Sequence, residues 1–375
     1  MSSRLQNTLT HNPLHQSIWR MLHLDGILLC LLLLLAAVGL FILYSASDKS
    51  LHTIEMQSAH LLFAFFILFL FAQIPPITWQ RWATSIYVAG GLLLIVVLII
   101  GHVGKGAQRW LNLFGLHLQP AELMKLAIPL ILAKYFHALP LPIKTRSILI
   151  ALPIIFIPAL LTAKQPDLGT AILIVTAGIS VLFLAGLNFK LLGGTIVGVI
   201  ASLPLVWYAL HDYQRQRILT FLNPERDPLG TGYHIIQSKI AIGSGGLFGK
   251  GFLHGTQSTL HFLPEHTTDF IFAVCGEEFG FVGCLLLLML FMLIVSRGLM
   301  ITLQAQDTFS RLFAGSITIM FFISLFINIS MVTGLLPVVG IPLPLVSYGG
   351  SSMVTMMASF GILMSIQTHK KLVTN

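Results

Sequence analysis

The stretch LDGILLCLLLLLAAVGLFILYSA, from Leu24 to Ala46, decides the fold class of this chain. An apolar run of about 20 residues is the length that an α-helix needs to cross a lipid bilayer. The same composition extends over all 375 residues, because 56% of them are hydrophobic and only 9% are charged, with a mean hydropathy of +0.89. Soluble domains carry about 25% charged residues. The sequence therefore predicts a helical membrane protein and excludes a soluble globular domain.

Ten runs of this kind, the first included, are predicted to be membrane spans. Because lipid cannot satisfy the open edge of a sheet, the spans are expected to be helices. We therefore expect an all-α integral membrane protein in which residues 1–375 form a single polytopic membrane domain. The predicted spans cover residues 24–46, 56–76, 82–101, 119–138, 146–163, 168–186, 189–210, 268–296, 308–333 and 345–367.

The distribution of Lys and Arg orients these spans. With the N-terminus inside, about eleven of these residues lie in inner segments and about four in the short outer loops, so both termini are expected in the cytoplasm. The net charge of +8 then reflects cytoplasmic loops near anionic lipid, and no nucleic-acid partner is expected. The acidic residues instead gather at the outer face, which we interpret as the mark of a functional site there.

One long polar interruption, from about residue 211 to 268, separates the seventh and eighth predicted spans. It begins with HDYQRQR (211–217) and ends with LPEHTTDF (263–270), so that Asp269 stands at the entrance of the eighth span. Ionisable groups at membrane depth are costly and are kept mostly for function. Two interpretations of Asp269 are equally open from residue types alone: a general base or an N-cap of the helix.

The motif QPAELMK, residues 119–125, opens the fourth predicted span. Glu122 and Lys125 are three residues apart and therefore share a helix face. A cap and a lysine that extends to the interface would explain both residues without function. Lys125 nevertheless points into the span from its outer end, which favours an ion pair facing a polar cavity.

Other polar residues near the outer face have open interpretations. Asp167, in the turn KQPDLG (164–169), either caps the sixth span, binds a cation, or positions Lys125 or Arg109. Glu277 and Glu278 lie about two turns into the eighth span and point about 100° apart, so at least one needs a buried partner.

Two further stretches lie inside and after the long loop. Residues 233–242 have the apolar spacing of a short amphipathic helix on the membrane surface. The glycine-rich stretch GSGGLFGKG (243–251) lacks the Gly-Lys-Ser/Thr ending of a phosphate loop, which favours a tight turn. Its backbone N–H groups are nevertheless candidates for contact with a diphosphate headgroup. Residues 337–352 are predicted to form a rigid outer loop.

Taken together, these motifs resemble the SEDS family of bacterial cell-wall polymerases over nearly the whole chain, and its elongation branch more than its division branch. The resemblance implies a peptidoglycan glycosyltransferase that polymerises lipid II, the undecaprenyl-diphosphate-linked disaccharide-pentapeptide, at the periplasmic face of the inner membrane. The motifs that carry it are HDYQRQR (211–217), DPLGTGYHIIQSKIAIGSGG (227–246), HGTQS (254–258), TDFIF (268–272) and VSYGGSS (346–352).

The resemblance also implies a set of site residues. The essential aspartate of the family falls on Asp269. The sequence departs from the family at Thr267, where a histidine usually stands, which puts a fixed role for that histidine in doubt; His266 is next to it. The candidate substrate-binding or cavity residues are Glu122, Lys125, Arg109, Asp167, Gln119, Lys105, Lys239, Glu277 and Ser347.

The reaction implied by the resemblance joins two sugars with inversion, so it needs a base and positive charge near the leaving diphosphate. Asp269 is the expected base, and Arg109, Lys125, Lys105 and Lys239 are candidates for the positive charge. A divalent cation, Mg²⁺ or Mn²⁺, held by carboxylates such as Glu122 or Asp167 would serve equally. The sequence does not choose between these sources, and no cofactor is certain.

Partners and rival functions follow from the same resemblance. A class B penicillin-binding protein and other membrane proteins of the elongation complex are the expected partners. A lipid II flippase is the main alternative, because the same cationic cavity would bind the same substrate. Transporters often carry internal repeats and charges at the bilayer midplane, and the sequence shows neither. A scaffold without activity is disfavoured, because it needs no paired ions inside a membrane.

Overall fold

The structure of the chain is a computed structural model that describes residues 22–370 with several gaps. The seventh predicted span, 189–210, falls almost entirely in these gaps, as do Lys105 and most of the motif at 211–217, so those expectations lie outside the described residues. The residues left out between 22 and 370 are 105–106, 114–115, 187–192, 194–207, 209–214, 216–218, 222, 224–230, 261 and 264.

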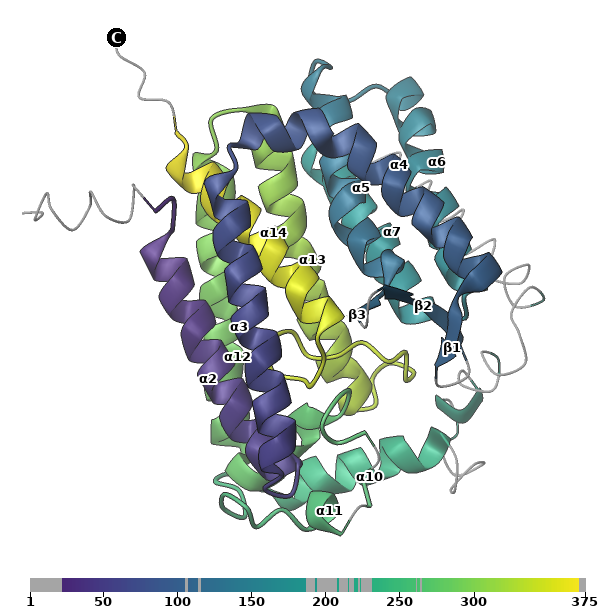
Figure 1. Ribbon diagram of the computed structural model, residues 1–375. Helices are drawn as coiled ribbons and strands as arrows, with labels where there is room; N and C mark the ends of the chain where they lie inside the picture. Colours follow the sequence, from purple (N-terminus) through teal and green to yellow (C-terminus); the bar gives the residue numbers. More distant parts are fainter. Residues whose placement is uncertain are drawn as a thin grey trace, which may run out of the picture.

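The other nine predicted spans coincide with helices (Figure 1). Each helix begins and ends within about six residues of its prediction, except the eighth, which starts at Ile271 and extends to Gln304. These helices are α2 (Gly26–Ala46), α3 (Leu51–Gln73), α4 (Pro76–Ile100), α5 (Pro120–His137), α6 (Thr145–Lys164), α7 (Leu168–Leu184), α12 (Ile271–Gln304), α13 (Thr308–Val332) and α14 (Ser351–Thr368).

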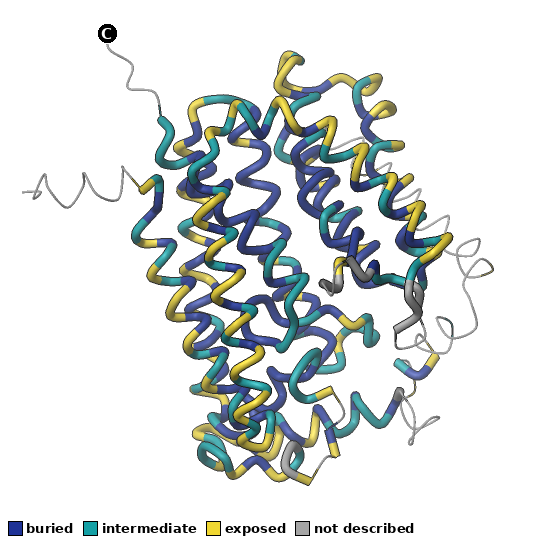
Figure 2. Tube along the Cα trace, viewed as in Figure 1, coloured by how far each residue is buried: buried dark blue, intermediate teal, exposed yellow. Residues whose placement is uncertain are grey.

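Six of the described helices, α2, α3, α4, α6, α12 and α13, are long and apolar enough to cross a membrane. They differ in burial, since 67% of an apolar 18-residue window of α13 is buried but only 22% of the corresponding window of α3 or α4. Figure 2 shows that buried residues dominate α5, α7 and α13, which form the interior of the bundle. Glu122 and Lys125 of α5 are therefore shielded from lipid by neighbouring helices.

The all-α expectation holds for the membrane part but misses a small antiparallel sheet between α4 and α5. Its strands are β1 (His102–Gly104), β2 (Ala107–Leu113) and β3 (Leu116–Leu118), in the order β1-β2-β3. The segment is rich in glycine, which is unfavourable inside a helix and common where strands turn back. The consequence for function is that Arg109 sits in a paired strand, next to Trp110, whose partner across the sheet is His102.

Both ends of the described chain lie at one end of the bundle. The rings of His23 and His369 stack at 3.8 Å, and Arg297 near the end of α12 forms an ion pair with Asp25, the N-cap of α2. In Figure 1 this end lies opposite the helices α10 (Thr231–Ser244) and α11 (Thr256–Thr259). The arrangement agrees with an even number of membrane crossings.

The eighth predicted span is a broken helix. Within α12, Gly280 has φ 64° and ψ −160°, so a short helix from Ile271 ends there and the long span begins after it. This backbone conformation is essentially restricted to glycine. A break inside a membrane helix leaves carbonyl and N–H groups without partners, which lipid cannot supply.

The glycine-rich stretch supplies those partners. The N–H groups of Lys250 and Gly251 donate to the carbonyls of Glu277 and Glu278, both at 3.0 Å. On the other side of the break, Phe281 N donates to Gly246 O at 2.9 Å and Val282 N to Leu247 O at 3.1 Å. We call residues 245–251 the glycine plug. Because its N–H groups at 249–251 bind protein carbonyls, they are not available to a diphosphate, and the stretch is better explained as part of the fold.

Replacing Gly280 by alanine is expected to destabilise the protein by about 2 kcal/mol or more, because the added Cβ meets the plug backbone in a strained conformation. The measurement is the thermal unfolding midpoint in detergent. Gly243→Ala is the matched control, since nothing lies within 4 Å of a Cβ at that helical position. Equal midpoints for the two variants would contradict the role of the plug.

Candidate active site

Asp269 lies just before α12 and is not its cap. The N-cap position is Phe270, without a side-chain cap hydrogen bond, so the capping interpretation of Asp269 is wrong. The main chain of Asp269 is held by Asn328 of α13, whose Nδ2 donates to Asp269 O at 2.9 Å. Its carboxylate lies beside Gly340, where an added Cβ would be 3.4 Å from Asp269 Oδ2. Asp269 is partly exposed, as a residue that meets a substrate must be.

The residues before Asp269 are tied to the loop between α13 and α14. Ser347 Oγ donates to Thr268 O at 2.5 Å and accepts from Leu343 N at 2.8 Å, while Tyr348 N donates to Thr267 O at 2.9 Å. Thr267, the position where the family usually has histidine, thus contributes its backbone to this contact. The ring of His266 instead contacts Leu263 O through Nδ1 at 2.7 Å.

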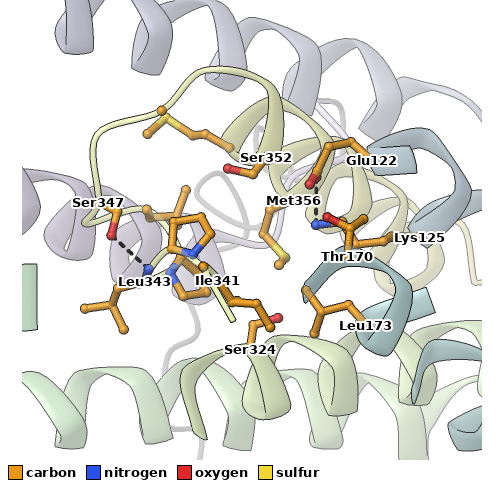
Figure 3. Close-up of a pocket in the computed structure, with 16 residues that line it drawn as sticks. Glu122, Lys125, Thr170, Leu173, Ser324, Ile341, Leu343, Ser347, Ser352 and Met356 are labelled. Atoms are coloured by element: carbon orange, nitrogen blue, oxygen red, sulfur yellow. Dashed lines mark hydrogen bonds and ion pairs between the residues drawn. The ribbon is translucent and has the colours of Figure 1, made fainter. Parts of the chain in front are cut away.

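A pocket lies where this loop meets the helices of the interior. Gly340 is part of its wall, and the Asp269 carboxylate lies beside Gly340 without itself lining the pocket. Figure 3 shows the pair of Glu122 and Lys125 on one side and Ser347 on the opposite side. The lining residues are Glu122, Lys125, Thr170, Leu173, Ser324, Met353, Met356 and members of the loop and helix start from Gly340 to Ser352.

The predicted ion pair on α5 is present and buried. Lys125 Nζ lies 2.7 Å from Glu122 Oε2, and each side chain is only 8% exposed. Both residues line the pocket, so the expected pair faces a cavity, although most of the other lining residues are apolar. Lys125 has three N–H donors, of which the contact with Glu122 uses one. The remaining donors can meet an anionic group in the pocket.

Asp167 is the centre of a second polar network. It caps α7, since Thr170 N donates to Asp167 Oδ1 at 3.1 Å. Its Oδ2 accepts from Gln119 Nε2 at 2.7 Å and from Thr170 Oγ1 at 3.0 Å, and Arg109 Nη1 lies 3.8 Å away. Two of the alternatives for Asp167 are therefore both realised, as a cap and as the residue that positions Arg109. Thr170 also lines the pocket, so the two networks meet there.

Five residues expected at the cavity do not line the pocket: Gln119, Arg109 and Asp167 form the neighbouring network, and Glu277 and Lys239 lie in other parts of the structure. Glu277 is fully buried and binds Lys250 Nζ at 2.7 Å and Thr256 N at 2.8 Å, so it holds α11 and the glycine plug on α12. Glu278, its neighbour, accepts a hydrogen bond from Ser45 of α2. Lys239 is exposed on α10, with its ammonium beside Gly334 at the end of α13. None of the three lines the pocket.

The two carboxylates named as metal candidates belong to different networks. Glu122 is paired with Lys125, and Asp167 with Gln119 and Thr170. Across the part of the chain that the structure describes, no group of three or more His, Cys, Asp or Glu side chains is placed to hold a metal ion.

Several residues of the site were not singled out from the sequence. Gln57 of α3 and Asn328 of α13 are fully buried amides that bind the backbone on either side of the pocket loop. Ser324 and Thr170 line the pocket itself. The available signal was an uncharged polar residue inside an apolar run, which must find a hydrogen bond when buried.

Sequence relatives match this chain over nearly their full length. Residues 25–372 match the family described as cell cycle protein, which unites FtsW, RodA and SpoVE. The chain is 50% identical to peptidoglycan glycosyltransferase MrdB of Escherichia coli K12 over 367 residues, 98% of this chain and 99% of MrdB. It is 38% identical to stage V sporulation protein E of Bacillus subtilis 168, covering 92% of this chain and 98% of that protein.

Solved structures of similar proteins share the fold of this chain. A chain from a study of the structural coordination of polymerization and crosslinking by a peptidoglycan synthase complex superposes with a TM-score of 0.80 at 32% identity, covering 93% of this chain and 99% of that chain. The rod shape determining protein RodA of Thermus thermophilus gives a TM-score of 0.71 at 28% identity, covering 93% and 98%. The family match and the identity to MrdB together show that this chain belongs to the SEDS family of FtsW, RodA and SpoVE proteins.

Proposed function

We propose that this chain polymerises lipid II into glycan strands at the outer face of the inner membrane during cell elongation, with Asp269 as general base. The chain is a peptidoglycan glycosyltransferase, as MrdB is. The observation that carries the proposal is that the Asp269 carboxylate lies beside Gly340, a wall residue of the pocket that is also lined by the buried pair of Glu122 and Lys125.

In the proposed reaction, Asp269 acts as the base and the pair of Glu122 and Lys125 provides positive charge. The 4-hydroxyl oxygen of the acceptor sugar attacks the anomeric carbon of the donor, and the bond from that carbon to the lipid diphosphate breaks with inversion. Asp269 takes the hydroxyl proton, and the diphosphate leaves with the bonding electrons. Lys125 offers its free N–H donors to the developing charge, and Glu122 keeps that ammonium fixed in the pocket.

Arg109 is the second source of positive charge in this proposal. Its side chain is 31% exposed and its guanidinium is oriented by Asp167, which Gln119 and Thr170 hold in turn. A cation that is both oriented and reachable can bind a diphosphate without large rearrangement. A divalent cation near Glu122 or Asp167 stays an alternative source of charge.

The proposal also includes the membrane topology of the chain and its partner protein. Ten crossings with both termini in the cytoplasm would place α10, α11 and the entrance to Asp269 on the periplasmic side. The chain would form one polytopic membrane domain. A class B penicillin-binding protein would crosslink the new strands, and the similarity to a chain of a peptidoglycan synthase complex supports such a partner.

Polymerisation and transport are separated by one experiment on the wild-type protein. Full-length chain with its elongation transpeptidase, the latter blocked by a β-lactam, is given labelled lipid II in detergent and, separately, in liposomes. Long glycan strands in detergent are the expected result, because polymerisation needs no second compartment. Translocation of lipid II across liposomes without strands in either format would replace the polymerase by the flippase.

A further inference from the structure

The backbone segment that carries Asp269 is a turn, in which Thr268 N and Phe270 N donate to Glu265 O at 3.1 and 3.2 Å. It lies between the long loop and α12, and α12 begins only at Ile271. A general base must be held within a fraction of an ångström of its proton donor, because small displacements cost large factors in rate. The groups that fix this segment therefore matter for the reaction as much as the carboxylate itself.

Asn328 of α13 fixes the segment directly. Its Nδ2 donates to the carbonyl of Asp269 at 2.9 Å and to the carbonyl of Ile341 at 2.8 Å. One side chain thus joins the main chain of the base to the loop that lines the pocket. Asn328 is fully buried, and its Oδ1 finds no hydrogen-bond partner among the described residues. Since an unpartnered buried oxygen is costly, an apolar side chain would serve packing better, and the amide is explained by its two donors.

Gln57 of α3 fixes the same loop from the opposite side. Its Nε2 donates to Ser347 O at 3.1 Å, and its Oε1 accepts from Gly349 N at 3.3 Å. Ser347 in turn restrains the residue before Asp269, because its Oγ donates to Thr268 O at 2.5 Å. Gln57 is also fully buried. It reaches Asp269 only through Ser347 and Thr268, whereas Asn328 reaches it directly.

We infer that Asn328 and Gln57 are positioning residues that hold Asp269 in its reactive place by clamping the pocket loop from α13 and α3. The inference rests on the proposed role of Asp269 as base. Both amides bond the backbone of residues that line the pocket, but neither side chain lines it, so neither is expected to bind substrate. Their loss should lower the rate of the chemical step and leave lipid II binding unchanged. The effect should be larger for Asn328 than for Gln57, in the order of their closeness to Asp269.

The test is steady-state polymerisation of labelled lipid II by the full-length chain with its β-lactam-blocked transpeptidase. The maximal rate is divided by the concentration of lipid II-binding sites to give kcat. Unfolded protein binds no lipid II and therefore does not lower this kcat. We expect Asn328→Leu to lower kcat about 30- to 100-fold and Gln57→Leu about 10-fold, each with KM within about twofold of wild type. Ser316→Ala is the control, since this buried side chain of α13 also bonds a carbonyl, Ala177 O at 2.9 Å, but belongs to the contact with α7.

The possible outcomes distinguish a failure of this inference from a failure of the proposed role of Asp269 as general base. Wild-type kcat in folded Asn328→Leu, while Asp269→Ala is inactive in the same assay, overturns the clamp and leaves the base in place. Activity in Asp269→Ala overturns both. A rise in KM with unchanged kcat also overturns the clamp, because it indicates a role in binding. If Asn328→Leu does not fold, Gln57→Leu decides alone: a tenfold loss of kcat supports the clamp, and wild-type kcat rejects it.

Discussion

Replacement of Asp269 by alanine is expected to lower lipid II polymerisation by about 10³-fold, the size of effect that follows removal of a general base. The protein should still fold, because Asn328 holds the carbonyl of residue 269 and not its side chain. Residue 269 is partly exposed, so its replacement should change the free energy of unfolding by less than about 1 kcal/mol. Strand length on gels and the thermal midpoint measure the two quantities.

Two further variants make this result specific. Asp269→Asn keeps the shape of the side chain but cannot take the proton, so it should be as inactive as alanine. Glu55→Ala removes an exposed acid from the outer end of α3 and should polymerise like wild type. Full-length strands from a folded Asp269→Asn protein would show that this carboxylate is not the base.

Lys125→Met should both destabilise the protein and stop polymerisation. It leaves the Glu122 carboxylate buried and unpaired, which costs about 3–5 kcal/mol in other proteins. Removing both charges in Glu122→Gln/Lys125→Met should restore most of the stability, since replacing a whole buried pair by neutral side chains is often tolerated. Polymerisation should stay at least about 100-fold below wild type, because the leaving diphosphate still lacks its ammonium.

The double variant separates a structural pair from a functional one. Lys134→Met is the matched control on the same helix, because Lys134 bonds Thr84 Oγ1 at 2.9 Å at the opposite, partly exposed end of α5. It should lose little stability and no activity. A stable double variant with wild-type polymerisation would mean that the pair only holds α5 in place.

Much of the site was readable from sequence because its signals are local. The spacing of Glu122 and Lys125 on one helix predicted their pair, and Asp167 directly before an apolar run predicted a cap. Glu277 was assigned to the cavity for the same kind of reason, a charge inside a span, but its partners come from residues 250–257. A carboxylate inside an apolar run predicts that the folded protein supplies a partner for it, but its position in the sequence does not identify that partner.

The sequence by itself determined that the chain is a bundle of membrane helices. A run of about 20 apolar residues is long enough to cross the bilayer, and a helix satisfies its backbone hydrogen bonds there. It also determined which family the chain resembles and which aspartate is expected to react. Only the tertiary structure decided where α12 breaks, how residues 245–251 satisfy that break, and that amides from α3 and α13 hold the segment of Asp269. Those contacts join residues as far as 292 positions apart. Periodicity and spacing report only neighbours along the chain, so such long-range pairings appear only once the helices are packed.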